Sequence, residues 1–279
     1  MIAPFDLTEE DFRIIQDFIH DKYGIYFKDE KRSFIKMKLN PRFISLGLKS
    51  FSEYIQFLKY GPESEKESRR MISLLTNTET YFFRELPQLN VFRDFLLPEL
   101  RKEKMTRNEK NIRILSAGCS TGEEVYTLAI MIFDSGIFFW GWDVGIIGMD
   151  VNERAIKAAR EGIYYERSFR LTDPEYRRRF FTSNSGDFIV KDSIKRMTSF
   201  VSGNITDQIT IGDIDAIFCR NVLIYFSDEK LKTAIKNFHM ALRPGAYLML
   251  GHSENLSGVF DGFETRRFPG TIIYKKREQ

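Results

Sequence analysis

Short apolar runs alternate with helical patterns from residue 111 to the end of the chain, and this alternation limits the fold more than any other feature. The runs that predict buried strands cover 112–117, 145–149, 214–219, 246–250 and 271–274. The segments with helical spacing of apolar residues lie between them, at 123–133, 152–160 and 228–242. Strands and helices in alternation build a parallel, doubly wound sheet, which binds its ligand at the carboxyl ends of the strands.

The alternation fails between residues 166 and 200. A basic run occupies 177–179, and the segments 188–190 and 198–201 have the composition of short strands. We therefore expect a small β insertion at about 166–200.

The first 75 residues have the pattern of a helical domain. Thr8 and the acidic residues after it predict a capped helix start, and Gly24 predicts the end of that helix. Further helices are predicted from about Asp29, from Ser50 and over 63–75, with a kink or break at Pro41. The expected organisation is a helical domain over 1–75, a connecting segment over 76–110 and an α/β domain over 111–279.

Composition excludes several classes of protein. With 43% hydrophobic and 29% charged residues the chain is an ordinary globular protein, and a net charge of +3 gives no sign of nucleic-acid binding. Two cysteines exclude a disulfide scaffold, and three histidines far apart argue against a metal site. No apolar run approaches the ~18 residues of a membrane helix, and the start lacks a signal-peptide pattern. We expect a soluble, cytoplasmic monomer without metal, nucleic-acid partner or membrane insertion.

Two features predict a nucleoside site. Gly118 and Gly122 lie in the loop after the first strand, where a ligand can approach the backbone closely. Asp150 ends the second strand, where a carboxylate can accept hydrogen bonds from both ribose hydroxyls. The loop has neither GxGxxG nor GK[ST], which argues against a nicotinamide enzyme and a P-loop NTPase.

Two further segments carry polar side chains toward the same region. The segment 76–84 joins the two domains and combines hydroxyl, amide and aromatic side chains with Arg84. The strand at 214–219 ends in Arg220 and Asn221, which should point into the ligand crevice, with Tyr225 shortly after.

The segments 75–85, 116–126, 148–152, 158–164, 218–226 and 251–254, in this order, closely resemble the CheR family of chemotaxis receptor methyltransferases. The resemblance covers roughly residues 10–275. It implies a Rossmann-like, S-adenosylmethionine-dependent methyltransferase with an N-terminal all-helical domain and a small antiparallel β insertion. The implied reaction is methyl-ester formation on glutamate side chains of methyl-accepting chemoreceptors in chemotaxis adaptation, with S-adenosylhomocysteine as the second product and the receptors' cytoplasmic domains as partners.

The resemblance also implies roles for individual residues. The residues implied to bind the cofactor are Thr78, Thr80, Arg84, Glu124, Asp150, Asn204, Ile205, Arg220 and Asn221. Among them, Asp150 would bind the ribose, and Asn204 with Ile205 would flank the adenine. Glu124, or its neighbour Glu123, would hold the methionine part or nearby groups of the cofactor. Arg84 and Tyr225 are the implied catalytic residues. The family usually reads Thr-Thr-Asn-Glu-Thr where this chain reads Thr-Asn-Thr-Glu-Thr at 76–80.

Charge is unevenly distributed in the helical region, with a net −5 over residues 1–21 and a net +6 over residues 22–49. Because chemoreceptor methylation regions are acidic helices in this family, we expect a basic substrate-binding face. The residues expected on it are Lys31, Arg32, Lys36, Lys38 and Arg42. Alternative functions are a methyltransferase on another protein or a small carboxylate, a non-catalytic cofactor-binding signalling module, and, more remotely, a nicotinamide oxidoreductase.

Overall fold

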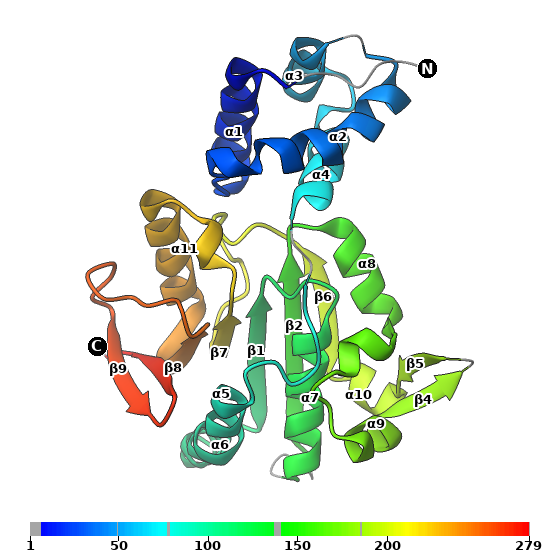
Figure 1. Cartoon of the computed structure of the whole chain (residues 1–279). Coiled ribbons are helices and arrows are strands. Elements are labelled where there is room, and N and C mark those ends of the chain that lie inside the picture. The colour runs from blue at the N-terminus through cyan, green and yellow to red at the C-terminus, as the bar shows by residue number, and fades with distance from the viewer. Residues whose placement is uncertain (1–6, 49, 77–78, 137–140, 185, 279) are drawn as a thin grey trace.

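The structure is a computed structural model that describes residues 7–48, 50–76, 79–136, 141–184 and 186–278 (Figure 1). Its N-terminal part is a cluster of helices above the sheet in Figure 1, with its own apolar core. These helices are α1 (Glu9–Tyr23), α2 (Arg32–Leu46), α3 (Phe51–Tyr60) and α4 (Ser64–Leu75), with a 3₁₀ turn η1 (Asp29–Lys31) before α2.

The predicted boundaries of α1 are confirmed. The Thr8 hydroxyl accepts a hydrogen bond from the Asp11 amide at 3.1 Å, and Gly24 ends the helix with φ +77°. The break expected at Pro41 is absent, because α2 continues to Leu46. Pro41 and Met37 both lie on the exposed face, so the Met37 carbonyl that loses its helical donor can be hydrated.

A seven-stranded sheet forms the second part, in the order β6-β2-β1-β7-β8-β10-β9. Its strands are β1 (Asn111–Ala117), β2 (Asp143–Asp150), β6 (Thr198–Ser202), β7 (Ile214–Cys219), β8 (Leu242–Leu250), β9 (Phe263–Phe268) and β10 (Thr271–Lys276). The first five strands in this order run parallel, as predicted. The carboxyl ends of these strands point toward the helical cluster (Figure 1).

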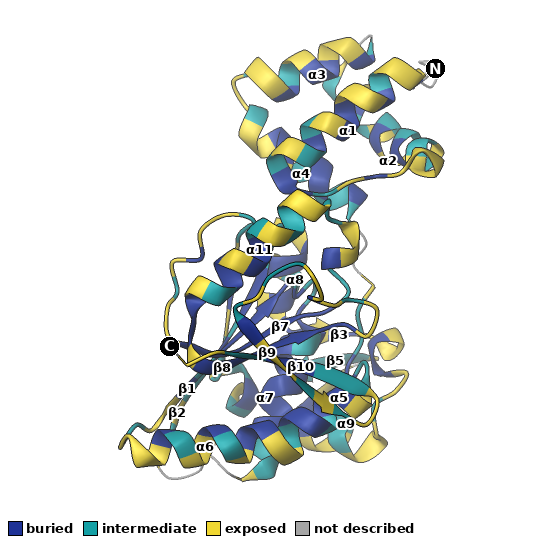
Figure 2. Ribbon diagram, turned by 90° about the vertical axis from the view of Figure 1, so that its left-hand side faces the viewer, coloured by how far each residue is buried: buried dark blue, intermediate teal, exposed yellow. Residues whose placement is uncertain are grey.

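Alternating side chains of the strands fill two apolar layers, one on each face of the sheet. Helices α7 (Glu123–Ser135) and α8 (Glu153–Glu161) pack against one face. The connecting region also covers that face, with α5 (Leu86–Val91), the π-helical turn η2 (Phe92–Leu96) and α6 (Leu97–Thr106). Helix α11 (Asp228–Ala241) covers the opposite face, which leaves the central strands buried (Figure 2).

Three expectations for the α/β region need correction. The last strand, β10, runs antiparallel to β8 and pairs with β9, which the sequence pattern did not reveal. Strand β8 begins at Leu242 directly after α11, so residues 243–245 belong to a strand rather than a turn. Strand β6 pairs with β2 in the main sheet and is therefore not part of the insertion.

The insertion is a separate three-stranded antiparallel sheet in the order β3-β5-β4. Its strands are β3 (Ile163–Tyr164), β4 (Phe181–Asn184) and β5 (Asp187–Val190). The short helices η3 (Glu166–Phe169) and α9 (Pro174–Phe180) lie between β3 and β4, and α10 (Asp192–Lys195) leads back to the main sheet. Along the described part of the chain, every helix is too short or too polar to cross a lipid bilayer.

Candidate active site

A cavity of about 630 Å³ lies at the carboxyl ends of the parallel strands, as expected for this type of sheet. The α/β part lines it with the loops that follow β1, β6 and β7, with the end of β2 and with Glu124 and Thr127 of α7. The helical cluster supplies the segment between α1 and α2, and the connecting segment supplies Thr80, Tyr81 and Arg84. The site therefore forms only where the helical cluster meets the sheet.

The loop after β1 makes one wall out of backbone. Gly118 has φ +81°, and a Cβ there would lie 2.4 Å from Cγ2 of Val222, so only glycine fits. The Met149 carbonyl accepts the amides of Gly118 and Cys119 at 2.7 and 3.0 Å, and this fixes the loop beside β2.

Asp150 stands at the end of β2 and lines the cavity, where the sequence predicted it. Its Oδ2 accepts the Ser120 amide and its Oδ1 accepts the Asn152 amide, each at 2.8 Å. Burial raises the pKa of the Asp150 carboxyl, and the two amide donors oppose that rise. The carboxylate oxygens keep lone pairs for further donors, so Asp150 can accept hydrogen bonds from the hydroxyl groups of a bound nucleoside.

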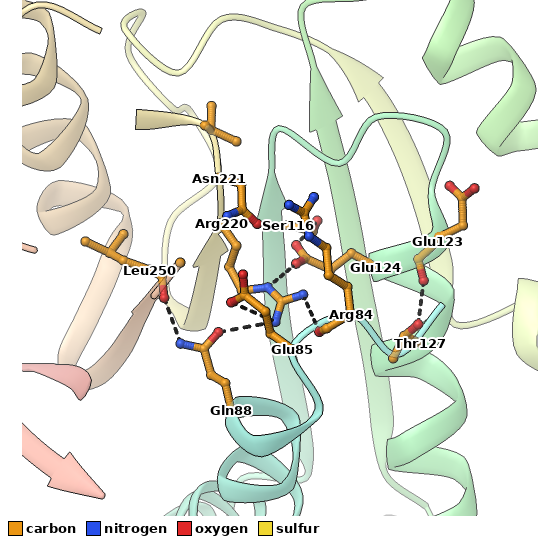
Figure 3. Close-up of polar contacts among 12 residues, drawn as sticks. Arg84, Glu85, Gln88, Ser116, Glu123, Glu124, Thr127, Arg220, Asn221 and Leu250 are labelled. Atoms are coloured by element: carbon orange, nitrogen blue, oxygen red, sulfur yellow. Dashed lines mark hydrogen bonds and ion pairs between the residues drawn. The ribbon is translucent and has the colours of Figure 1, made fainter. Parts of the chain in front are cut away.

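Arg220 lines the cavity and connects three parts of the chain (Figure 3). Its guanidinium is almost fully buried and donates to Glu124 Oε2 at 2.6 Å and to the Arg84 carbonyl at 2.9 Å. A third bond, to Gln88 Oε1, is longer at 3.3 Å. The Ser116 hydroxyl donates to the other oxygen of Glu124 at 2.7 Å. Glu124 is therefore held from two sides at the cavity wall.

Glu123 lies apart from the cavity. Its buried carboxylate accepts the hydroxyls of Thr121 and Ser168 at 2.6 and 3.0 Å, and burial raises its pKa. Figure 3 shows its side chain on the far side of α7 from Arg220. Of the two acidic neighbours, Glu124 is the one that lines the cavity.

Arg84 lines the cavity from the connecting segment and donates to the Glu79 carbonyl at 3.2 Å. The Tyr81 ring lies 5.7 Å from the Arg84 guanidinium and 3.8 Å from that of Arg170, which comes from the insertion. Thr80 also lines the cavity, whereas Thr78 lies outside the described residues.

The loop after β7 brings Asn221 and Tyr225 to the cavity. The Tyr225 side chain is partly exposed, and its carbonyl accepts the Tyr26 amide at 2.8 Å. Asn221 has φ +60°, and its Oδ1 is buried without a hydrogen-bond partner among the described residues. An orphaned acceptor in a cavity wall is a place for a ligand donor.

Asn204 and Ile205 line the cavity from the loop after β6. The Asn204 amide donates to the Lys22 carbonyl at the end of α1, at 3.2 Å. This contact ties the helical cluster to the part of the cavity predicted to hold adenine.

The basic face is narrower than the sequence predicted. Lys31 and Lys38 are exposed and line the cavity mouth, with Nζ atoms 5.9 and 5.6 Å from the Phe34 ring. Arg32 donates to the Leu7 carbonyl at 2.7 Å, and Lys36 does not line the cavity. Arg42 is wrongly placed on that face, because its guanidinium pairs with Glu67, whose side chain is 1% exposed.

The sequence did not reveal two contributors to the site. The segment 23–28, between α1 and α2, lines the cavity with Tyr23, Ile25, Tyr26 and Phe27. The sequence pattern that could have indicated this is the run of apolar residues just after Gly24, which ends the helix. Glu254 is the second contributor, since its carboxylate holds the loop that carries Asn221. The segment 251–254, which carries part of the family resemblance, pointed to this region but gave Glu254 no role.

The residues present fit an S-adenosylmethionine site. Asp150 offers a carboxylate for ribose hydroxyls, Asn221 offers an unsatisfied acceptor, and Gly118 lets a ligand reach the backbone. Among the described residues, His, Cys, Asp and Glu form no group of three or more suited to a metal ion.

Comparison with known proteins agrees with this geometry. Residues 10–76 match the family domain described as "CheR methyltransferase, all-alpha domain", and residues 78–271 match "CheR methyltransferase, SAM binding domain". "Chemotaxis protein methyltransferase 2" of Vibrio cholerae is 32% identical, over 97% of this chain and 94% of that protein. "Chemotaxis protein methyltransferase" of Vibrio parahaemolyticus is 34% identical, over 96% and 98%. The protein of that name from Salmonella typhimurium is 32% identical, over 96% and 90%. With an S-adenosylmethionine-binding domain and an all-helical domain that both match, this chain belongs to the CheR methyltransferase family.

Proposed function

We propose that this protein transfers the methyl group of S-adenosylmethionine to glutamate side chains of chemoreceptors and forms glutamate methyl esters. One observation carries the proposal. A single cavity joins a nucleoside-type site at Asp150 to exposed lysines at its mouth, Lys31 and Lys38, in a chain of the CheR family. The names of the relatives support the choice of a chemotaxis protein as substrate.

The positions of several residues around the cavity support the cofactor-binding roles that the family resemblance implies. Asp150 would accept the ribose hydroxyls, and Asn204 with Ile205 would flank the adenine. Glu124, fixed by Arg220 and Ser116, would hold the methionine part together with Arg84 and Thr80. Thr78 would join them from the same segment. When bound, S-adenosylmethionine supplies a methyl group on a positively charged sulfur.

The chain's own residues need not remove a proton from the substrate. A glutamate carboxyl has a reference pKa of ~4.3, so the nucleophile is already ionised near neutral pH. The requirement is alignment of the carboxylate and exclusion of water from the cavity, rather than base catalysis.

A cation that gripped the attacking oxygen would slow the reaction. Two unit charges 4 Å apart attract by about 4 kcal/mol at an effective dielectric constant of ~20, and that attraction would stabilise the reactants. We therefore assign Arg84 to orienting carboxylate groups without a bidentate grip on the nucleophile. Tyr225 would orient the attacking oxygen by donating one neutral hydrogen bond from its hydroxyl.

The mouth of the cavity indicates how substrate arrives. Lys31 and Lys38 flank the opening, and Ile224 and Tyr225 expose apolar surface beside it. A helix that presents acidic residues, with a glutamate to be methylated among them, would complement this rim. Exposed charges of this kind mainly raise the association rate.

Methyl transfer in isolated membranes tests the proposal. The protein is incubated with methyl-labelled S-adenosylmethionine and membranes that contain chemoreceptors, and in parallel with membranes from cells that lack them. We expect label in the receptors, released by mild base because carboxyl methyl esters hydrolyse readily. Equal labelling of receptor-free membranes, or label that resists base, would contradict the proposal. Label in small carboxylic acids alone would favour a small-molecule methyltransferase.

A further inference from the structure

The loop that follows β7 contains a residue with an unfavourable backbone conformation. It begins with Asn221 in the left-handed region, at φ +60°, and ends with Tyr225 in a short 3₁₀ turn, η4 (Leu223–Tyr225). Both residues line the cavity. A non-glycine residue in this region costs free energy, so other contacts must hold the loop.

The carboxylate of Glu254 supplies those contacts. Its Oε1 accepts the amides of Val222, Leu223 and Ile224, at 3.0, 2.7 and 3.3 Å. Its Oε2 accepts the amides of Asn221 and Gly251, at 3.0 and 2.7 Å. One side chain thus gathers four successive amides of the loop and one from the strand end beside it. Backbone hydrogen bonds to a charged acceptor are the strong kind.

Gly251 permits this close packing. A Cβ on residue 251 would lie 2.8 Å from Glu254 Oε2 and 2.9 Å from the Asn221 amide nitrogen. The φ of Gly251 is not in the left-handed region, so the need for glycine is steric and arises from the carboxylate and the loop.

The Asn221 side chain also takes part in the site, because the residue lines the cavity. Its Oδ1 is buried and has no hydrogen-bond partner among the described residues. A substrate carboxylate cannot satisfy that oxygen, since both are acceptors. A hydrogen-bond donor of the bound cofactor would satisfy it.

We propose that Glu254 is a positioning residue for methyl transfer. It holds the loop over 221–225 so that the Asn221 oxygen faces the cofactor and the Tyr225 hydroxyl faces the substrate. The inference deepens the proposed function and rests on it. Glu254 itself does not line the cavity, so it acts through the residues that do.

Two variants test this role by separate routes. Glu254→Gln keeps the shape of the side chain but replaces one acceptor oxygen with an NH₂ group that faces backbone amides. Gly251→Ala keeps the carboxylate but pushes a methyl group against it. The matched controls are Glu109→Gln, on a carboxylate far from the site, and Gly212→Ala, where a Cβ would meet no atom within 4 Å.

Each test variant is expected to lower kcat on receptor at least tenfold and, through Asn221, to weaken affinity for S-adenosylhomocysteine by a clearly smaller factor. Hydrogen exchange of the peptide over 221–225 should become faster in Glu254→Gln and remain unchanged in both controls. Wild-type kcat and wild-type exchange in Glu254→Gln would overturn the positioning role. A parallel loss of kcat, cofactor affinity and melting temperature would also overturn it, in favour of a structural role.

The outcomes also separate this inference from the proposed function. If the wild-type protein binds S-adenosylhomocysteine but transfers no methyl group to receptor, the proposed function is wrong. The exchange measurement needs no substrate, and unchanged exchange in Glu254→Gln refutes the anchoring of the loop in either case.

Discussion

Asp150 is subject to two opposing influences at the end of β2. Burial disfavours its charge, and the amides of Ser120 and Asn152 favour it. Two ribose hydroxyls would add donors to the same carboxylate. Asp150→Ala should therefore weaken affinity for S-adenosylhomocysteine tenfold or more, since each charge-assisted hydrogen bond is worth ~1.5–3 kcal/mol. Calorimetric titration measures this. Asp143→Ala, at the exposed start of the same strand, is the control and should bind as wild type.

The raised pKa of Asp150 also predicts the pH dependence of binding. The carboxylate accepts ribose hydroxyls best when it is ionised, so affinity is highest above this pKa and falls as pH decreases through it. Because the pKa is raised, the fall begins at a higher pH than for an ordinary aspartate, whose pKa is about 3.9. Calorimetric titrations with S-adenosylhomocysteine at decreasing pH, for wild type and Asp150→Asn, test whether Asp150 binds the ribose. An equal decline in both proteins would show that another group is responsible.

The sequence could predict those site residues whose position depends only on neighbouring residues in the chain. Gly118 and Asp150 were predictable because a strand end followed by a tight turn brings the backbone and one carboxylate to the ligand. Glu254 was not, because its five amide partners come from two loops that only the folded sheet brings together. Arg42 was misplaced for a similar reason, since its partner Glu67 lies on another helix.

At the scale of elements, the ion pair between Arg42 and the buried Glu67 holds α2 against α4. Glu67 accepts from the Arg42 guanidinium and from the Tyr54 hydroxyl, at 3.2 Å for the latter. Arg42→Ala would leave a buried carboxylate with weaker partners, and we expect a loss of roughly 3 kcal/mol in the free energy of unfolding. Urea unfolding followed by circular dichroism measures it. Arg13→Ala removes an exposed ion pair with Glu9 and should cost below about 0.5 kcal/mol. Similar losses in both variants would contradict the account of Arg42.

The strands that are buried in the sheet were predictable from the sequence, whereas the placement of the strands at its edges was not. β7 is buried along its whole length, and apart from Asp215 its residues form an apolar run. β6 and β9 lie at the two edges of the sheet and mix polar with apolar residues. Their patterns therefore resemble the insertion or a loop, and β6 was assigned to the wrong sheet.

The β insertion packs closely against the connecting segment, although its irregular sequence suggests an independent unit. Phe82 of the connecting segment packs between Phe169 and Phe181, with ring centroids 5.0 and 4.9 Å away. The Phe82 amide donates to the Ser168 carbonyl at 2.9 Å. Deleting the insertion would expose this core beside Arg84, so a deletion cannot isolate its role in binding protein. The division into segments at 75 and 110 remains a prediction.

At the scale of the whole molecule, the helical cluster and the sheet share the site. The Tyr26 amide bonds to the Tyr225 carbonyl, Ile25 forms a β-bridge with Phe226, and the His20 ring lies 2.9 Å from the Ser227 hydroxyl. The cavity's basic rim comes from the helical side, and the residues proposed to bind the cofactor come from the sheet side and the connecting segment. Sequence predicted both parts but not their contact, because the segment over 23–28 carries no motif of its own.

This arrangement predicts that substrate docking and cofactor binding can be changed independently. Lys31→Glu with Lys38→Glu should raise KM for receptor and flatten its salt dependence, because salt screens exposed charges over ~8 Å at physiological ionic strength. Affinity for S-adenosylhomocysteine should stay near wild type. The control is Lys232→Glu with Lys236→Glu on the exposed face of α11, which changes the net charge equally. An unchanged KM at low salt in the rim variant would refute the docking role.

The most direct test of the account is mass spectrometry of a receptor cytoplasmic fragment after incubation with the protein and methyl-labelled S-adenosylmethionine. We predict that the fragment gains the mass of one methylene group per event, that peptide mapping places it on glutamate side chains, and that Asp150→Ala slows the gain. A fragment whose mass does not change, or a methyl group mapped to another type of residue, would contradict the central claim.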